Sequence, residues 1–193
     1  MIEDLVRKAR SCRRFIEEPI TEELLRNLVE LARLSASAAN RQPLKYALSH
    51  RKEMNDLIFP KLKWAAYLPD WQGPEEGERP SAYIIVMGDT EISKSFGCDH
   101  GIATQNIVLG ATSLGLGCCI IGAVDRISLR EELKIPDRLE ILHLIALGKP
   151  GEKIVIEKMG PEGDIKYWHD ESGVHHVPKR ALEDIILPVG IQM

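Results

Sequence analysis

The first residues of the chain whose types suggest chemistry are the cations of a short run, RSCRR, at positions 10–14. Guanidinium groups bind phosphate through paired hydrogen bonds, and a serine hydroxyl can donate another. Arg10, Ser11 and Arg13 therefore form the best candidate anion site in the sequence. The alternative is a solvated basic turn that balances the glutamates at positions 17 and 18, because short charge clusters commonly face water.

A second polar segment, SASAANRQP, occupies positions 35–43. Its small and polar residues and its terminal proline are typical of an ordered loop. The side-chain amides of Asn40 and Gln42 both donate and accept hydrogen bonds, which suits the edge of a heteroaromatic ring that carries carbonyls and ring nitrogens. A loop that only caps its neighbours fits the same composition.

Three histidines near the C-terminus raise the question of a metal site: His169, His175 and His176. Adjacent residues of a strand point to opposite faces, so His175 and His176 are badly placed to share an ion, and no cysteine or carboxylate spacing supports them. We predict no metal site. The sequence also lacks a P-loop, a G-x-S-x-G motif and a dinucleotide-binding G-x-G-x-x-G motif.

The stretch 99–122, DHGIATQNIVLGATSLGLGCCIIG, is expected to position the other elements. Its apolar residues do not fall on one stripe, which predicts a buried central helix that ends near Gly115. An interior strand, Cys118 to Ile121, should follow, and Gly122 would let a ligand approach the backbone closely. Small residues along the helix permit close packing of a second subunit or of another helix of the same chain. Polar residues interrupt the apolar run, which makes a membrane span the poorer interpretation.

Hydrophobic periodicity and capping signals predict the remaining elements. Thr21 is the expected N-cap of the second helix, and Ser128 opens a helix that ends before Pro136. We expect helices at 2–9, 22–34 and 52–59, strands at 44–49, 82–87 and 139–147, and a hairpin of 164–169 with 174–177.

Residues 61–80 are the least regular part of the chain and contain three aromatic side chains, Trp64, Tyr67 and Trp71. The segment is either a lid that covers a pocket with aromatic surface or a long loop that its tryptophans anchor. The sequence favours neither interpretation.

Bulk properties limit the class of protein. A chain of 193 residues with 44% hydrophobic content suits one domain, 1–193. Its formal charge of −4 argues against a general affinity for nucleic acid. The N-terminus lacks the apolar core of a secretory signal, and the four cysteines show no C-x-x-C spacing. We expect a cytoplasmic protein with reduced thiols that does not bind a membrane.

Four segments in this order resemble the nitroreductase family of flavoproteins: RSCRRF at 10–15, SAANRQP at 37–43, the helix and strand at 101–122, and ALGKP at 146–150. The resemblance implies an α+β fold with a mixed, largely antiparallel sheet flanked by helices. It also implies a homodimer that forms through long central helices and binds FMN at the interface.

The resemblance further implies a role for each cluster. Arg10 and Arg13 would hold the FMN phosphate, and Ser11 would bond phosphate or ribityl oxygens. Loop residues of the other subunit would contact the ribityl chain and ring, backbone at the end of the interior strand would lie by the ring edge, and a cation near the C-terminus would complete the phosphate site. The loop residues are Ser37, Asn40 and Gln42; the strand residues are Ile120, Ile121 and Gly122; the last cation is Lys179 or Arg180.

The implied activity is that of an oxidoreductase that passes hydride from NAD(P)H through flavin N5 to an electron-poor small molecule, such as a nitroaromatic or a quinone. Because the cofactor carries this chemistry, no catalytic side chain is assigned. Tyr67 or Tyr167 is a candidate proton donor only if it lies near the ring. The alternatives are a specialised flavin reaction, namely dehalogenation, heterocycle dehydrogenation or flavin breakdown, and a flavin-binding protein without activity.

Overall fold

The main sheet forms around β3 (Ala82–Asp89), all of whose residues are buried. The computed structural model describes residues 1–68 and 71–190. Alternate side chains of β3 enter two hydrophobic cores, Ile84 and Val86 on one face and Tyr83 and Ile85 on the other. Burial on both faces is the reason that this strand is a continuous apolar run in the sequence.

The neighbours of β3 are all antiparallel. β5 (Leu139–Pro150) pairs along one side of it and β2 (Leu44–Ser49) along the other. The opposite edge of β5 pairs with β4 (Gly117–Ile121) and, further along, with β1 (Phe15–Ile16). The strand order is therefore β1-β5-β3-β2, with β4 beside β5.

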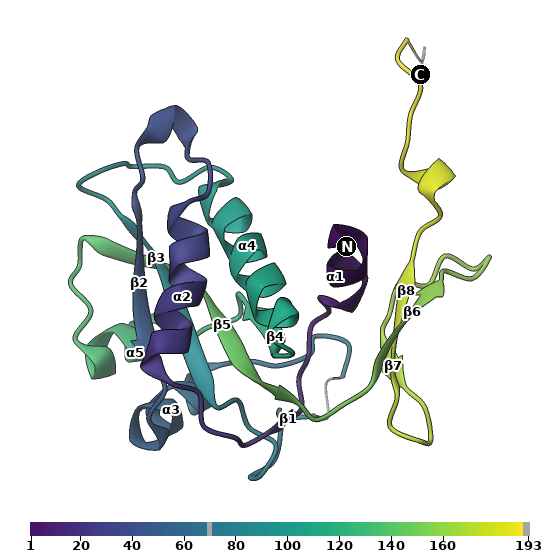
Figure 1. The fold of residues 1–193 in the computed structure, drawn as a ribbon, viewed down its shortest axis with the longest axis horizontal. Helices are drawn as coiled ribbons and strands as arrows, with labels where there is room; N and C mark the ends of the chain where they lie inside the picture. The colour runs from purple at the N-terminus through teal and green to yellow at the C-terminus, as the bar shows by residue number, and fades with distance from the viewer. Residues whose placement is uncertain (69–70, 191–193) are drawn as a thin grey trace.

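Helices cover both faces of this sheet (Figure 1). α2 (Glu22–Arg33) and α4 (Asp99–Ser113) pack on one face, where Leu28 and Ile107 are fully buried. α3 (Lys52–Ile58) and α5 (Arg126–Leu133) contribute Ile58 and Leu129 to the core on the other face. α1 (Ile2–Lys8) buries no residue and contacts α4. The α+β class predicted from the sequence is confirmed.

Local capping signals located one helix start correctly and one wrongly. Thr21 caps α2, because its hydroxyl accepts a hydrogen bond from the amide of Leu24 at 3.2 Å. Ser128 was predicted to open the helix that ends before Pro136. This prediction is wrong, because that helix, α5, begins at Arg126 and its N-cap is Asp125. Asp125 accepts hydrogen bonds from the amide and hydroxyl of Ser128 at 3.1 and 2.7 Å.

Within a single chain the central helix, predicted to be buried, is covered on one side. Ala103, Ile107 and Ala111 of α4 face the core, whereas Ile102 is 40% exposed and Leu114, just after the helix, is 59% exposed. The apolar pattern lacks a single stripe because one face packs on α2 and the sheet while another apolar face lies on the surface of the chain.

The described residues of the segment 61–80 are anchored by a tryptophan. Trp64 is buried in the core and meets Trp71 edge-on at 6.5 Å between ring centroids. Gly73 has a φ of +115°, and a Cβ there would lie 2.5 Å from Trp64 Cδ1, so this close approach requires glycine. The contacts favour the anchored loop over the lid; residues 69–70 lie outside the described part.

A second, smaller sheet lies to one side of the main body (Figure 1). β7 (Trp168–His169) and β8 (His175–Lys179) form the predicted hairpin with a shorter first strand and a longer second one. β6 (Ile154–Lys158), which the sequence analysis did not predict, pairs with β8 in parallel. Short 3-10 turns lie at Ala38–Asn40, Phe59–Lys61 and Leu182–Asp184. Within residues 1–68 and 71–190, no helix has the length and apolar character needed to cross a membrane.

A buried histidine in the main sheet makes stability depend on pH. His143 of β5 lies 2.7 Å from the Thr104 hydroxyl of α4, and burial, with help from nearby His100 and Arg126, lowers its pKa to about 4. The unfolded chain, with a histidine pKa near 6.5, binds more protons than the folded chain between these values. The contribution of neutral His143 to the free energy of unfolding is therefore complete above about pH 6.5, and it is lost as the pH falls toward 4.

We expect the free energy of unfolding to fall by about 2 kcal/mol from this group between pH 7.5 and pH 5. Urea denaturation of the wild type and of His143→Gln at both pH values measures it, because all other titrating groups are shared. An equal pH dependence in the two proteins would contradict the assignment.

Candidate functional site

A cavity of about 460 Å³ lies between the end of α1 and the C-terminal strand β8. The five residues predicted to hold a phosphate all line it, although the 165 residues from 14 to 178 separate the two groups that they form. They are Arg10, Ser11, Arg13, Lys179 and Arg180. The structure thus brings all the predicted phosphate ligands together in one chain.

The segment that carries the first three ligands is fixed to the main sheet. Ser11 forms a parallel bridge with Cys118 of β4, and the Cys12 amide donates a hydrogen bond to the Cys118 carbonyl at 2.8 Å. Cys12 itself is buried, and burial raises the pKa of its thiol to about 12. These backbone contacts tie the segment to β4 at Ser11 and Cys12, and Cys12 offers no reactive thiolate.

Arg10 has an unused hydrogen-bond donor. Its Nη2 donates to the Val6 carbonyl at 2.8 Å, but its Nε is buried without a partner, and burial lowers the pKa of the guanidinium. A buried donor without an acceptor is costly, and a bound anion would supply the acceptor.

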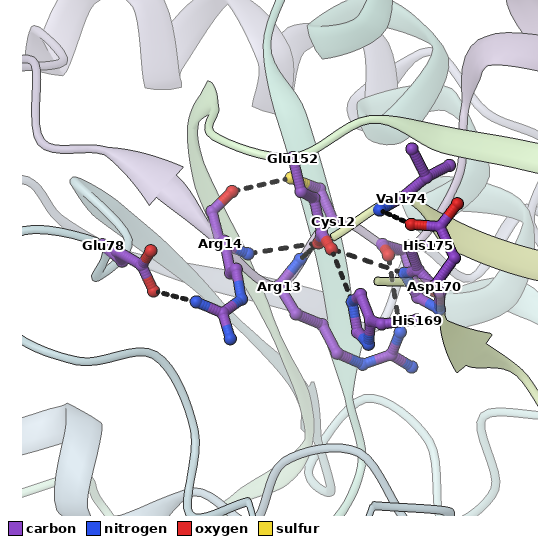
Figure 2. A network of polar contacts seen from close by, with 10 residues as sticks. Cys12, Arg13, Arg14, Glu78, Glu152, His169, Asp170, Val174 and His175 are labelled. Carbon is purple, nitrogen blue, oxygen red and sulfur yellow. Dashed lines mark hydrogen bonds and ion pairs between the residues drawn. The ribbon is translucent and has the colours of Figure 1, made fainter. Parts of the chain in front are cut away.

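Arg13 and Arg14 of the run point in different directions (Figure 2). The Arg13 guanidinium lies 4.4 Å above the Tyr167 ring in the cavity wall, which fixes the side chain there. Arg14 instead forms an ion pair with Glu78 at 2.7 Å. Arg10 and Arg13 therefore line the cavity, whereas Arg14 is paired with a carboxylate of the same chain.

Behind the cavity lies a carboxylate that the sequence analysis missed, Glu152 (Figure 2). Its Oε1 accepts hydrogen bonds from the backbone amides of Arg13 and Arg14. Its Oε2 lies 3.2 Å from His169 Nε2 and 3.5 Å from His175 Nδ1. Burial alone would raise the pKa of Glu152, but the contacts with His175, the Arg13 amide and His169 outweigh it and lower the pKa to about 2.

The C-terminal histidines lie on two opposite faces of the small sheet. His176 faces away from its neighbour and contacts Glu157 and Asp170, as expected for adjacent residues of a strand. His169 and His175 are cross-strand partners on the other face and share Glu152. No local spacing signals this cluster, because Glu152 precedes the hairpin by 17 residues and meets it only through the packing of the tail.

The predicted ring-binding loop adopts an unusual backbone conformation. Ala39, Asn40 and Gln42 have φ of 51°, 52° and 52°, in the left-handed region. Asp99 holds the start of the loop: it accepts a hydrogen bond from the Ser37 hydroxyl at 2.6 Å and another from the Ala38 amide at 3.0 Å. Asp99, in the first turn of α4, therefore orders the loop.

The loop and the cations face different cavities within one chain. Ser37 and Gln42 line a second cavity of about 560 Å³, whereas Arg10 and Arg13 line the first. Asn40 is exposed, and its carbonyl accepts a hydrogen bond from Gln42 Nε2 at 3.2 Å. One chain alone does not bring the two predicted groups of ligands into one site.

The residues whose backbone was predicted to lie by the flavin ring edge are at the end of β4. Ile120 is exposed, Ile121 is buried in the core, and Gly122 is exposed with open space where a Cβ would project. The Gly122 carbonyl accepts a hydrogen bond from Arg126. The two candidate proton donors form a pair instead: the rings of Tyr67 and Tyr167 lie 5.2 Å apart.

Comparison with known proteins agrees with the fold. The family described as the Nitroreductase family matches residues 6–149. This chain therefore belongs to the nitroreductase family.

Similar proteins include two from archaea, each provisionally named NADH dehydrogenase/NAD(P)H nitroreductase. The protein from Methanothermobacter thermautotrophicus is 30% identical over 156 residues, 77% of each chain. The protein from Archaeoglobus fulgidus is 29% identical over 152 residues, which are 75% of this chain and 82% of that protein. A crystal structure from Desulfovibrio desulfuricans, described as a nitroreductase assigned provisionally and in complex with FMN, has a TM-score of 0.70 at 23% identity and covers 99% of this chain and 98% of that one.

Proposed function

We propose that this protein is an FMN-dependent oxidoreductase that uses NAD(P)H to reduce electron-poor small molecules such as nitroaromatics or quinones. The observation that carries the proposal is the cavity in which Arg10, Ser11 and Arg13 meet Lys179 and Arg180. The names of the archaeal relatives and the FMN bound to the Desulfovibrio protein support it.

The residues present fit the phosphate of a flavin nucleotide. Four of the residues that line the cavity are arginine or lysine, and the buried Arg10 Nε lacks an acceptor. A phosphomonoester offers two negative charges and several acceptor oxygens, which match this donor set. The flavin, when bound, supplies the hydride and electron transfer.

In this proposal the side chains and backbone of the protein bind and orient the flavin. Arg10 and Arg13 hold the phosphate, and Ser11 adds a hydroxyl donor. The exposed backbone at Ile120 and Gly122 lies where it can approach a ring edge, because no side chain fills the space above Gly122. Backbone N–H donors at such an edge stabilise negative charge that develops on reduction. No side chain is assigned a catalytic role.

A homodimer with shared sites is part of the proposal. Ser37, Asn40 and Gln42 would complete the partner subunit's site, because within one chain Ser37 and Gln42 line a cavity separate from that of the cations. The exposed apolar residues Ile102 and Leu114 leave the central helix region with a surface suited to a second copy.

The test is an anaerobic absorbance spectrum of the purified protein before and after NADH or NADPH, with the molar mass measured in solution. We expect flavin bands that bleach and return when a quinone is added, and a mass about twice 21.7 kDa. Bands that persist with both donors would indicate a flavin-binding protein without this activity. Absence of bands after incubation with FMN would overturn the proposal.

A further inference from the structure

His175 is a buried side chain with no assigned role. The residue is 0% exposed, its Nδ1 has only the Glu152 carboxylate nearby, at 3.5 Å, and its Nε2 has no partner among the described residues. It nevertheless lines the cationic cavity together with Arg10, Arg13 and Lys179. Because a buried imidazole without partners is costly, the arrangement indicates that a ligand in this cavity supplies one.

Glu152 determines which nitrogen of His175 is available. The carboxylate is held by the amides of Arg13 and Arg14 and lies 3.5 Å from His175 Nδ1. A carboxylate on this side favours a proton on Nδ1, as in other carboxylate–histidine pairs. Nε2 then remains as the nitrogen free to bind a ligand in the cavity.

We propose that His175 is a phosphate ligand of the flavin site: Nδ1–H donates to Glu152, and Nε2–H donates to the phosphomonoester of FMN. This rests on the proposed function. Both ring nitrogens then act as donors in the bound state. Each ring nitrogen of His175 then has a hydrogen-bond partner.

A metal ion is the competing occupant, because Glu152, His169 and His175 offer ligand atoms that lie within 4.8 Å of one another. A metal bound at these atoms would use His175 Nδ1 and leave Nε2 unpartnered. It would also add a cation beside a cavity that arginines and lysine already line. The observations therefore favour the phosphate.

The test compares asparagine substitutions at two adjacent histidines. In His175→Asn the side-chain amide replaces Nδ1 beside Glu152 but does not reach the position of Nε2. The matched control is His176→Asn, whose native side chain faces Glu157 and Asp170. Dissociation constants for FMN and riboflavin are measured by quenching of flavin fluorescence, and thermal unfolding checks the folding of each variant.

We expect His175→Asn to weaken FMN binding about 10-fold, the loss of one charge-assisted hydrogen bond, and to leave riboflavin binding within about twofold. His176→Asn should leave both constants within about twofold. His175→Gln, whose amide reaches the position of Nε2, should restore part of the FMN affinity.

Several results would overturn the assignment. Equal FMN affinity of His175→Asn and the wild type would do so, as would an equal loss of riboflavin and FMN affinity. Stoichiometric zinc in the purified wild type that disappears in His175→Asn would establish the metal instead. If His175→Asn fails to fold, His175→Gln supplies the test, and a loss of FMN affinity matched by an equal loss of riboflavin affinity would overturn the assignment. A wild type that binds no FMN would overturn the proposed function itself, which the other results do not.

Discussion

Replacing Arg10 with alanine is expected to raise the dissociation constant for FMN by roughly 100-fold, because the variant loses a cation and its charge-assisted hydrogen bonds to phosphate. The physical basis is the buried Arg10 Nε, which has no acceptor among the residues that the structure describes, although Arg10 lines the cationic cavity. Titration of the flavin-free protein with FMN, followed by fluorescence quenching, measures the change.

The matched control is Arg7→Ala in α1, three positions before Arg10. Arg7 is exposed and its guanidinium contacts Glu3 at 2.9 Å, so its removal should leave the FMN constant within about twofold. Arg10→Lys should give an intermediate affinity, because it keeps the charge but loses the planar set of donors. Similar affinities for Arg10→Ala and Arg7→Ala would show that the cavity does not hold the phosphate.

Replacing Leu129 with alanine is expected to lower the free energy of unfolding by about 2 to 5 kcal/mol, the usual cost of truncating a fully buried leucine. Leu129 is 0% exposed and belongs to the core in which α5 packs on the sheet. Urea denaturation without flavin measures the effect, since a ligand that binds only the folded state would add to the apparent stability.

The same helix offers the control. Ile127 is two residues away and 75% exposed, and Ile127→Ala should change the free energy of unfolding by no more than about 0.5 kcal/mol. The residues that line the cationic cavity do not include either position, so FMN affinity should stay unchanged in both variants. Comparable destabilisation by the two substitutions would contradict the packing of α5 described above.

Much of the fold follows from short-range patterns. The continuous apolar run in β3 predicted a strand that is covered on both faces, and Thr21 marked the start of α2 by its side-chain oxygen. The arginine and serine types at positions 10–13 indicated phosphate chemistry, and the structure places them in one cavity with Lys179 and Arg180. In each case the signal lies in residue type and local spacing, which the sequence contains directly.

The sequence by itself thus determined the elements of the main sheet, the phosphate-binding candidates and the resemblance to the family, whereas tertiary structure decided which distant groups meet. Glu152 contacts the Arg13 amide across 139 positions, and Ser37 bonds Asp99 across 62. Whether α4 is covered on one side or all round also depends on what packs against it. Such contacts arise from chain topology and close packing, and local propensity and periodicity carry no information about them.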